Sequence, residues 1–135
     1  MVKGWSEVRD HVRGKYHIAV DEPARLGLLW TFPNADGVQR QYIQPVTAFG
    51  LPHVMITANV ATTQILKAYD ALLHNTQLAI GGLCIEEGFY ILKVVLPIEG
   101  VDLAVIDRSL QFIAHEAARL RSKATPKPAP APYYE

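Results

Sequence analysis

The sequence has little of what cross-linking, charge-driven binding and membrane insertion require. Its 135 residues include a single cysteine, Cys84, so no disulfide can form within the chain. Thirteen Lys and Arg residues balance thirteen Asp and Glu residues, and the chain lacks the net positive charge that attracts nucleic acid or an anionic membrane. No apolar run approaches the roughly 20 residues that span a bilayer, and residues 1–10 contain no apolar signal segment. These absences predict a cytoplasmic protein that binds no nucleic acid and does not insert into a membrane.

The composition is that of a folded domain. Hydrophobic residues make up 50% of the chain and charged residues 19%, which excludes a disordered, solvated polymer. A chain of this length usually forms one domain and removes roughly two-thirds of its unfolded surface from water. Because few charges are available to cover the surface, we expect some apolar surface to stay exposed or to be covered by a partner.

The first half of the chain has the pattern of one helix followed by three strands. Apolar residues at three- and four-residue steps predict a helix over residues 5–16. Alternating apolar residues and strand-favouring types then predict strands over 18–32, 38–49 and 54–60. Clusters of Pro, Gly, Asn and Asp separate the strands, as expected for turns.

The second of these strands has two unusual features. Half of its residues are polar, including Gln39 and Gln41, which predicts that one face meets solvent. It also contains Pro45, which has no backbone N–H to donate to a neighbouring strand. This proline indicates a sheet edge or a bulge.

The second half has the pattern of a helix, a hairpin and a long final helix. Thr62 or Thr63 can cap a helix that ends near Asn75. Apolar runs over 78–85 and 89–98 then predict a hairpin with an acidic tip. The last helix has a strict apolar stripe that can pack on a sheet or, as an alternative, form a coiled-coil seam. Its members are Leu103, Ile106, Leu110, Ile113, Ala117 and Leu120.

Residues that can carry chemistry are present, but their spacing matches no known catalytic or metal-binding motif. None of the five histidines stands at a metal-signature spacing from another His, Cys or carboxylate. Each serine falls in an expected helix, without the turn that positions a serine nucleophile. We therefore predict no catalytic residue, no metal and no cofactor. Active sites are assembled in space, so a small enzyme or ligand-binding domain stays open as an alternative.

Two segments have features typical of protein binding. After residue 123 the chain repeats proline, which favours an extended conformation that loses little entropy on docking, and two tyrosines can supply aromatic anchors. A disordered tail or linker is the alternative interpretation. The first helix offers a second apolar surface, for which core packing is the alternative. The predicted partner-binding residues are Trp5, Val8, Val12, Pro128, Pro130, Pro132, Tyr133 and Tyr134.

The order of elements resembles a known fold. We expect residues 1–123 to form one domain in the order helix, three strands, helix, two strands and helix, and residues 124–135 to form a tail. This order resembles the type III secretion chaperone-like fold, which bacterial secretion chaperones share with the YbjN-like family. The resemblance implies an α+β fold with helices packed on a five-stranded antiparallel sheet, frequent homodimerisation, and a role in holding or regulating another protein without catalysis.

The net charge and the strand count distinguish the family alternatives. Secretion chaperones are usually acidic, and because this chain is neutral we favour a YbjN-like adaptor or scaffold of a bacterial assembly. The second choice is a roadblock or longin-type regulator of a small GTPase. That architecture places two strands before the middle helix and three after it, whereas we expect three before and two after.

Overall fold

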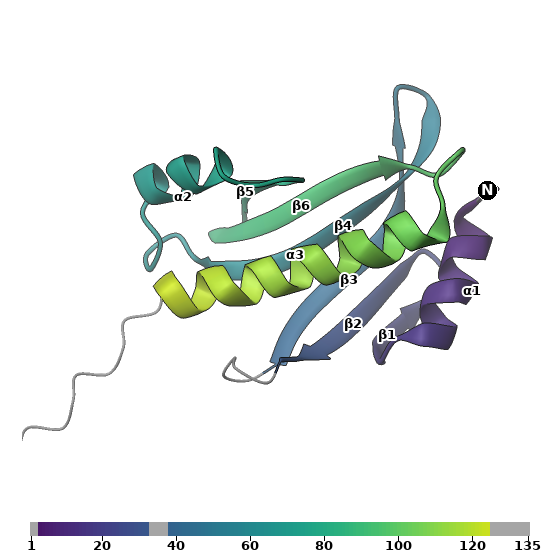
Figure 1. The fold of residues 1–135 in the computed structure, drawn as a ribbon, viewed down its shortest axis with the longest axis horizontal. Helices are drawn as coiled ribbons and strands as arrows, with labels where there is room; N and C mark the ends of the chain where they lie inside the picture. Colours follow the sequence, from purple (N-terminus) through teal and green to yellow (C-terminus); the bar gives the residue numbers. More distant parts are fainter. Residues whose placement is uncertain (1–2, 33–37, 125–135) are drawn as a thin grey trace, which may run out of the picture.

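Three helices and six strands form the part of the chain that the computed structural model describes, residues 3–32 and 38–124 (Figure 1). All paired strands are antiparallel, in the order β1-β2-β3-β4-β6-β5. This is the predicted α+β class. In chain order the elements are α1 (Trp5–Lys15), β1 (Ile18–Glu22), β2 (Arg25–Thr31), β3 (Val38–Ala48), β4 (Leu51–Thr62), α2 (Ala68–Asn75), β5 (Gly82–Glu86), β6 (Phe89–Pro97) and α3 (Leu103–Ala124).

The sheet has one strand more than predicted, because the segment over 18–32 folds as a hairpin instead of a single strand. β1 and β2 pair from Ile18 opposite Leu28 to Glu22 opposite Arg25. Pro23 lies in the turn between them, where its missing N–H removes no hydrogen bond from the ladder. The prediction of a five-stranded sheet is therefore wrong. Four strands precede α2, so the chain keeps the chaperone-like order and departs further from the roadblock arrangement.

Helix α3 lies across one face of the sheet, against β3, β4 and β6 (Figure 1). Its apolar residues share one side of the helix, and Ile106, Leu110 and Ile113 are completely buried. α3 thus packs on the sheet of its own chain, which is the first of the two predicted arrangements, and not as a coiled-coil seam. The same core includes Val8 and Val12 of α1, which lies beside the N-terminal half of α3.

The polar residues of β3 do not simply face solvent, as their pattern suggested. Gln39 is 2% exposed and Gln41 is completely buried. The Gln41 amide donates from Nε2 to the Leu110 carbonyl at 2.9 Å, while its Oε1 accepts from Trp30 Nε1 at 2.8 Å. A buried amide costs little when its polar groups are hydrogen-bonded. Gln41 therefore links β2, β3 and α3 from inside the core.

Pro45 lies where β3 has lost one of its neighbours. The pairing of β2 with β3 ends at Leu26 opposite Ile43, whereas β3 and β4 continue as far as Ala48 opposite Leu51. The part of β3 that carries Pro45 pairs with β4 alone. This end of β3 is therefore a sheet edge, as predicted, although the rest of β3 lies between two strands.

Two boundaries in the second half differ from the predictions. α2 begins at Ala68, after a turn in which the Thr62 carbonyl accepts hydrogen bonds from the N–H groups of Ile65 and Leu66. No side chain caps this helix. β5 begins at Gly82 and not at residue 78. The acidic hairpin tip is confirmed, because Glu87 and Gly88 have φ values of 51° and 83°, the left-handed pair that a tight two-residue turn requires.

Candidate protein-binding surfaces

Helix α2 exposes an apolar stripe to solvent. Tyr69, Leu72 and Leu73 are 75%, 68% and 51% exposed, and their spacing places them on one side of the helix. Ala71 is the residue of α2 that is buried. We call Tyr69, Leu72 and Leu73 the α2 stripe. The spacing of these apolar residues fits a helix, but periodicity alone does not tell whether such a stripe meets the core or solvent.

Few contacts hold α2 in place. Asn75, its last residue, accepts a hydrogen bond from the Leu83 N–H of β5 at 2.6 Å and donates to the Leu83 carbonyl at 3.4 Å. His74 lies with Nε2 at 3.5 Å from Oε1 of Glu116 on α3. An isolated helix of this length is unstable in water, so these contacts and the burial of Ala71 position the α2 stripe.

The contact between α2 and α3 is sensitive to charge. Burial lowers the pKa of His74, Arg119 and Lys123 lower it further, and Glu116 opposes them. The hydrogen bond from Arg119 holds the pKa of Glu116 below its usual value. Protonation of His74 is therefore less favourable in the folded chain than in the unfolded one.

A second exposed surface lies at the tip of the hairpin that joins β3 to β4. Phe49 is 99% exposed and Leu51 is 56% exposed. Phe49 and Gly50 occupy the turn, with φ values of 54° and 73°. The sequence pattern placed Phe49 at the end of a strand and the turn at residues 50–52, so this surface was missed. A signal was available, since two-residue turns of this kind favour glycine in the position that Gly50 takes.

The predicted binding residues of α1 lie mainly in the core. Val8 and Val12 are completely buried, which matches the core-packing interpretation of this helix. Trp5 is partly buried, and its Nε1 donates to the Pro23 carbonyl at 2.7 Å. Binding of a partner by Val8 and Val12 would require α1 to move away from the sheet, so partner binding by α1 stays a prediction.

The other predicted binding residues lie outside the described residues. These are the prolines and tyrosines of the tail, Pro128, Pro130, Pro132, Tyr133 and Tyr134. α3 extends to Ala124, one residue beyond the predicted end of the domain. The role of the tail stays a prediction.

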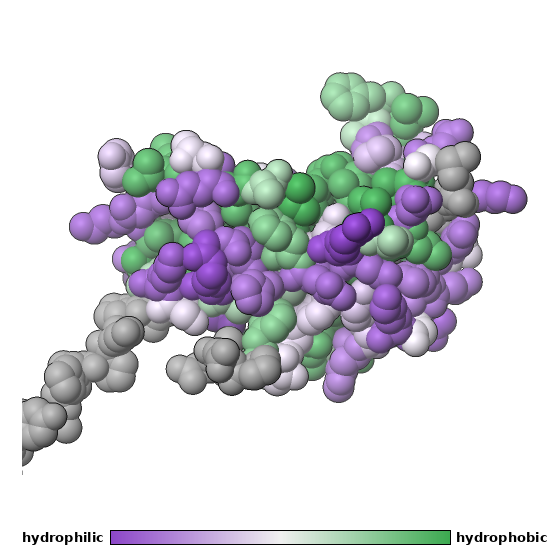
Figure 2. Space-filling view, viewed as in Figure 1, coloured by the Kyte–Doolittle hydropathy of each residue, from purple (hydrophilic) through white to green (hydrophobic). Residues whose placement is uncertain are grey.

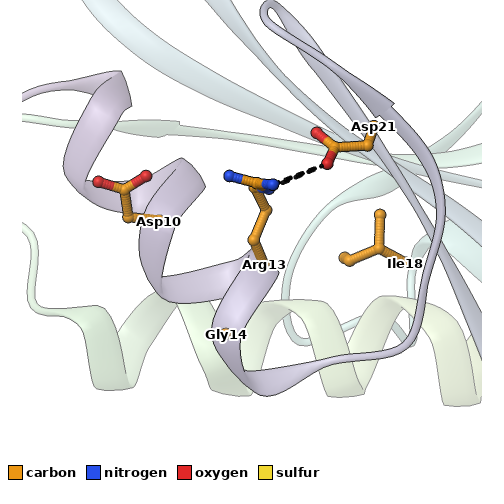
Figure 3. A pocket seen from close by; sticks show the side chains of 5 residues that line it. All are labelled: Asp10, Arg13, Gly14, Ile18 and Asp21. Atoms are coloured by element: carbon orange, nitrogen blue, oxygen red, sulfur yellow. Dashed lines mark hydrogen bonds and ion pairs between the residues drawn. The ribbon is translucent and has the colours of Figure 1, made fainter.

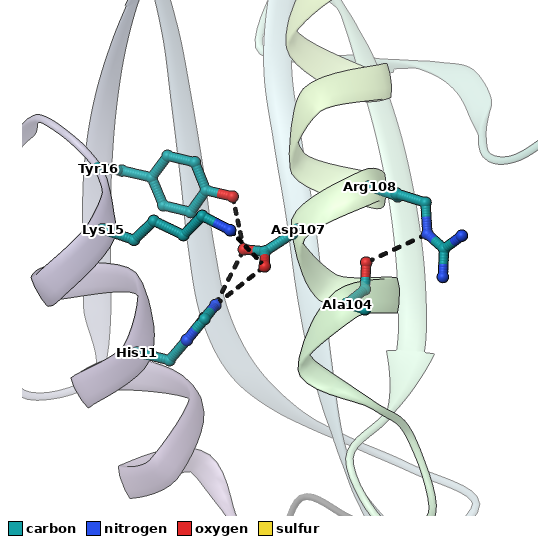
Figure 4. A network of polar contacts seen from close by, with 6 residues as sticks. All are labelled: His11, Lys15, Tyr16, Ala104, Asp107 and Arg108. Carbon is teal, nitrogen blue, oxygen red and sulfur yellow. Dashed lines mark hydrogen bonds and ion pairs between the residues drawn. The ribbon is translucent and has the colours of Figure 1, made fainter.

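A polar cluster joins α1 to α3 around Asp107 (Figure 4). The Asp107 carboxylate accepts hydrogen bonds from Tyr16 Oη and from Lys15 Nζ, the latter at 2.9 Å, and it lies 2.9 Å from His11 Nε2. Burial alone would raise the pKa of Asp107, but these hydrogen bonds outweigh it and hold the pKa below its usual value. Burial and the contact with Asp107 raise the pKa of Tyr16. The cluster pins two helices together, and its charges are already paired.

A shallow pocket of about 410 Å³ lies between α1 and β1 (Figure 3). Its lining includes an ion pair between Arg13 and Asp21 at 3.0 Å, with Asp10 on the same helix as Arg13. No histidine, serine or cysteine lines it. The pocket holds two carboxylates, Asp10 and Asp21, and the second of them is paired with Arg13.

Metal-binding and membrane-spanning features are also lacking within the ranges 3–32 and 38–124. No group of three or more His, Cys, Asp and Glu side chains there could hold a metal ion. No helix of this part of the chain combines the length and apolar character needed to cross a membrane.

The fold can be compared with known proteins. No protein-family model matches the sequence, and no curated protein matches it either. Among solved structures, the chain is similar to a chain in the structure of the HopA1–SchA chaperone–effector complex, with a TM-score of 0.58 and 12% sequence identity. The similarity covers 84% of this chain and 88% of that chain. At this level of identity the comparison shows a chaperone-like fold.

Proposed function

We propose that this chain is a non-catalytic protein-binding module, a chaperone-like adaptor or scaffold that acts as a homodimer. The observation that carries the proposal is the α2 stripe, because three large apolar side chains are exposed together on one short helix. Apolar side chains gathered in this way are typical of protein interfaces. A partner that covers them removes apolar surface from water, which favours association.

A second copy of the chain is the partner that we assign to the α2 stripe. In a dimer with two-fold symmetry the same surface faces itself, so an apolar stripe finds a matching stripe on the other copy.

A different protein is the client that the module would hold. The similar solved chain comes from a complex between a chaperone and an effector, which favours this kind of role. The proline-rich tail over 124–135 would supply a binding element that is separate from the domain over 1–123. Because the chain has no net charge, we favour a YbjN-like adaptor in the cytoplasm of a bacterium.

The substitution Leu72→Glu tests the homodimer. Glutamate favours helix, so α2 should form while a charge is placed in the middle of the stripe. We expect the wild-type chain to dimerise with rising concentration in analytical ultracentrifugation and the variant to stay monomeric. Val38→Glu is the matched control, because Val38 is a 48% exposed apolar residue of β3 and should leave the dimer intact. A wild-type chain that is monomeric at high concentration contradicts the homodimer.

A truncated chain that ends at Lys123 tests the tail. Affinity purification with the full chain and with this shortened chain, from the cells in which the protein occurs, would compare the proteins that each retains. We expect the shortened chain to lose or weaken at least one specific partner. Equal recovery of the same proteins contradicts a binding role for the tail.

A further inference from the structure

The β3–β4 hairpin carries an aromatic side chain that is almost fully exposed and makes almost no contact with the described part of the chain. The hairpin projects beyond the body of the molecule, and its apolar tip stands clear of the surrounding surface (Figures 1 and 2). Phe49 is 99% exposed there, the highest value among the large apolar residues of the described chain. The ring is therefore almost entirely in water and contributes almost no buried apolar surface to the fold.

The backbone at this position disfavours phenylalanine. Phe49 has a φ of 54°, in the left-handed region that glycine, asparagine and aspartate tolerate best. Its neighbour Gly50, at 73°, suits the same turn without strain. Side chains held in sparsely populated backbone regions cluster at binding sites. Local structure would thus favour asparagine at this position, and no burial within residues 3–32 and 38–124 accounts for a phenylalanine there.

Apolar side chains continue from the tip onto the face of the sheet opposite α3. Along β3 and β4, successive side chains point to opposite faces of the sheet, and those that face α3 alternate with Val46, Leu51 and Met55. These three therefore lie on the face away from α3, where Met55 pairs with Val95 of β6. Val95 is 41% exposed. We call Phe49 with these four residues the tip surface. It consists of one projecting ring and a mainly apolar stretch of the sheet face, in which His53 stands directly opposite Val46.

The charges around the tip surface define what can cover it. The chain has no Asp, Glu, Lys or Arg from Gln41 to Leu66, a stretch that includes the whole hairpin tip. The charge next to the hairpin tip is acidic: Glu99 is exposed and follows Ile98, whose N–H donates to the Pro52 carbonyl at 3.1 Å. Lys93 lies at the far end of the tip surface, on the same face of β6 as Val95. The tip therefore lacks the cations that hold a protein on an anionic membrane, and a cationic rim would complement Glu99.

We propose that Phe49 is an anchor that inserts into an apolar pocket with a cationic rim on a folded partner protein. The tight turn presents the ring on a fixed backbone, which lowers the entropic cost of docking into a preformed pocket. One buried aromatic ring surrounded by weaker apolar contacts is the usual anatomy of an interface hot spot. This inference rests on the proposed protein-binding role but not on the homodimer, and it identifies the client-binding surface and the chemistry of the client's pocket.

Cross-linking at the tip would identify the partner. A photoreactive phenylalanine analogue is placed at position 49 of the full chain, and in a control chain at Val38, the exposed residue at the other end of β3. Each chain is irradiated in an extract of the cells in which the protein occurs. We expect one protein to cross-link at position 49 and not at 38, through a peptide that lines an apolar pocket near Lys or Arg. Absence of such a protein, or cross-linking to a second copy of this chain, overturns the proposal.

Titration with that purified protein then measures the anchor. Phe49→Asn should weaken binding by at least about ten-fold, the size expected for a hot-spot side chain, while raising the urea midpoint of unfolding because asparagine tolerates the turn. Val38→Asn should leave the affinity unchanged. Glu99→Lys should weaken binding less than Phe49→Asn, and most at low salt. An affinity unaffected by Phe49→Asn refutes the anchor and leaves the proposed protein-binding function standing.

Lipid vesicles test the competing class of partner. The full chain with Phe49→Trp is mixed with phosphatidylcholine vesicles, with and without phosphatidylserine, and the emission of the new tryptophan is compared with that of the wild-type chain. We expect no blue shift with either vesicle. A blue shift that depends on the residue at position 49 would assign the tip to a membrane surface and overturn the protein-pocket proposal.

Discussion

The side-chain amide of Asn75 pairs with both backbone polar groups of Leu83. Its Oδ1 accepts from the Leu83 N–H at 2.6 Å, and its Nδ2 donates to the Leu83 carbonyl at 3.4 Å. These two groups belong to β5, the outermost strand next to β6, and they point away from the ladder. The amide thus imitates a short piece of strand and covers part of an edge that would otherwise be free to pair with another chain.

Replacing Asn75 should loosen α2 and uncover the edge of β5. We expect Asn75→Ala to lower the free energy of unfolding by about 1 kcal/mol, as for the loss of a partly buried hydrogen-bonded pair. Hydrogen exchange should accelerate in α2 and at Leu83, and self-association should become less specific. Gln77→Ala is the control, because Gln77 is an exposed amide two residues further along. Unchanged exchange at Leu83 would show that the amide does not protect the edge.

Asp107 is expected to be the main polar link between α1 and α3. Asp107→Asn keeps the shape of the side chain but removes the charge that accepts hydrogen bonds from Lys15 and Tyr16. We expect a loss of about 2 kcal/mol at neutral pH in urea unfolding, because hydrogen bonds to charged groups exceed neutral ones. Asp10→Asn, at an exposed position of α1, should change stability little.

The same carboxylate predicts a specific pH dependence. Because the pKa of Asp107 is lower in the folded chain than in the unfolded chain, its contribution is fully present above about pH 4. That contribution is lost as pH falls through the lowered folded pKa. The difference in unfolding free energy between wild type and Asp107→Asn should therefore shrink on acidification. A difference that stays constant from neutral pH to the acid range contradicts this assignment.

His74 predicts that α2 is held more weakly in mild acid. Its pKa is lowered by burial and by nearby Arg119 and Lys123, so the unfolded chain takes up a proton more readily than the folded one. The stability that neutral His74 contributes is present above its unfolded pKa of about 6.5 and is lost as pH falls toward the lowered folded pKa. Hydrogen exchange of α2, corrected for the intrinsic pH dependence, should accelerate between about pH 7.5 and pH 5.5.

Two variants separate His74 from the other histidines. His74→Gln should remove the acid-dependent acceleration of exchange in α2. His17→Gln should leave it unchanged, because His17 is exposed and precedes β1, away from the contact between α2 and α3. Acid-dependent exchange that persists in His74→Gln would assign the effect to another group.

Secondary structure was predicted more accurately from long sequence patterns than from short ones. The apolar stripe of α3 was predicted correctly. Ile106, Leu110 and Ile113 repeat at helical spacing, so all three side chains lie on one side of the helix and are buried against the sheet. The segment over 18–32 was predicted as one strand although Pro23 breaks it, because a strand and a tight hairpin share the same residue types on either side of a turn. A sequence pattern predicts the structure correctly where it is long enough to fit only one type of secondary structure.

Sequence patterns by themselves determined the class of the fold, the order of its helices and the lack of recognisable catalytic or metal-binding motifs. Only the tertiary structure decided which apolar surfaces are free, because burial depends on the neighbours that a chain brings together from distant positions. The sequence left both partner binding and core packing open for Val8 and Val12, and the structure buries them completely. Leu72 and Phe49 lie in segments that the sequence predicted as an ordinary helix and strand, and they are 68% and 99% exposed. The proposed interfaces therefore come from the packing of the sheet and its helices and not from any local motif.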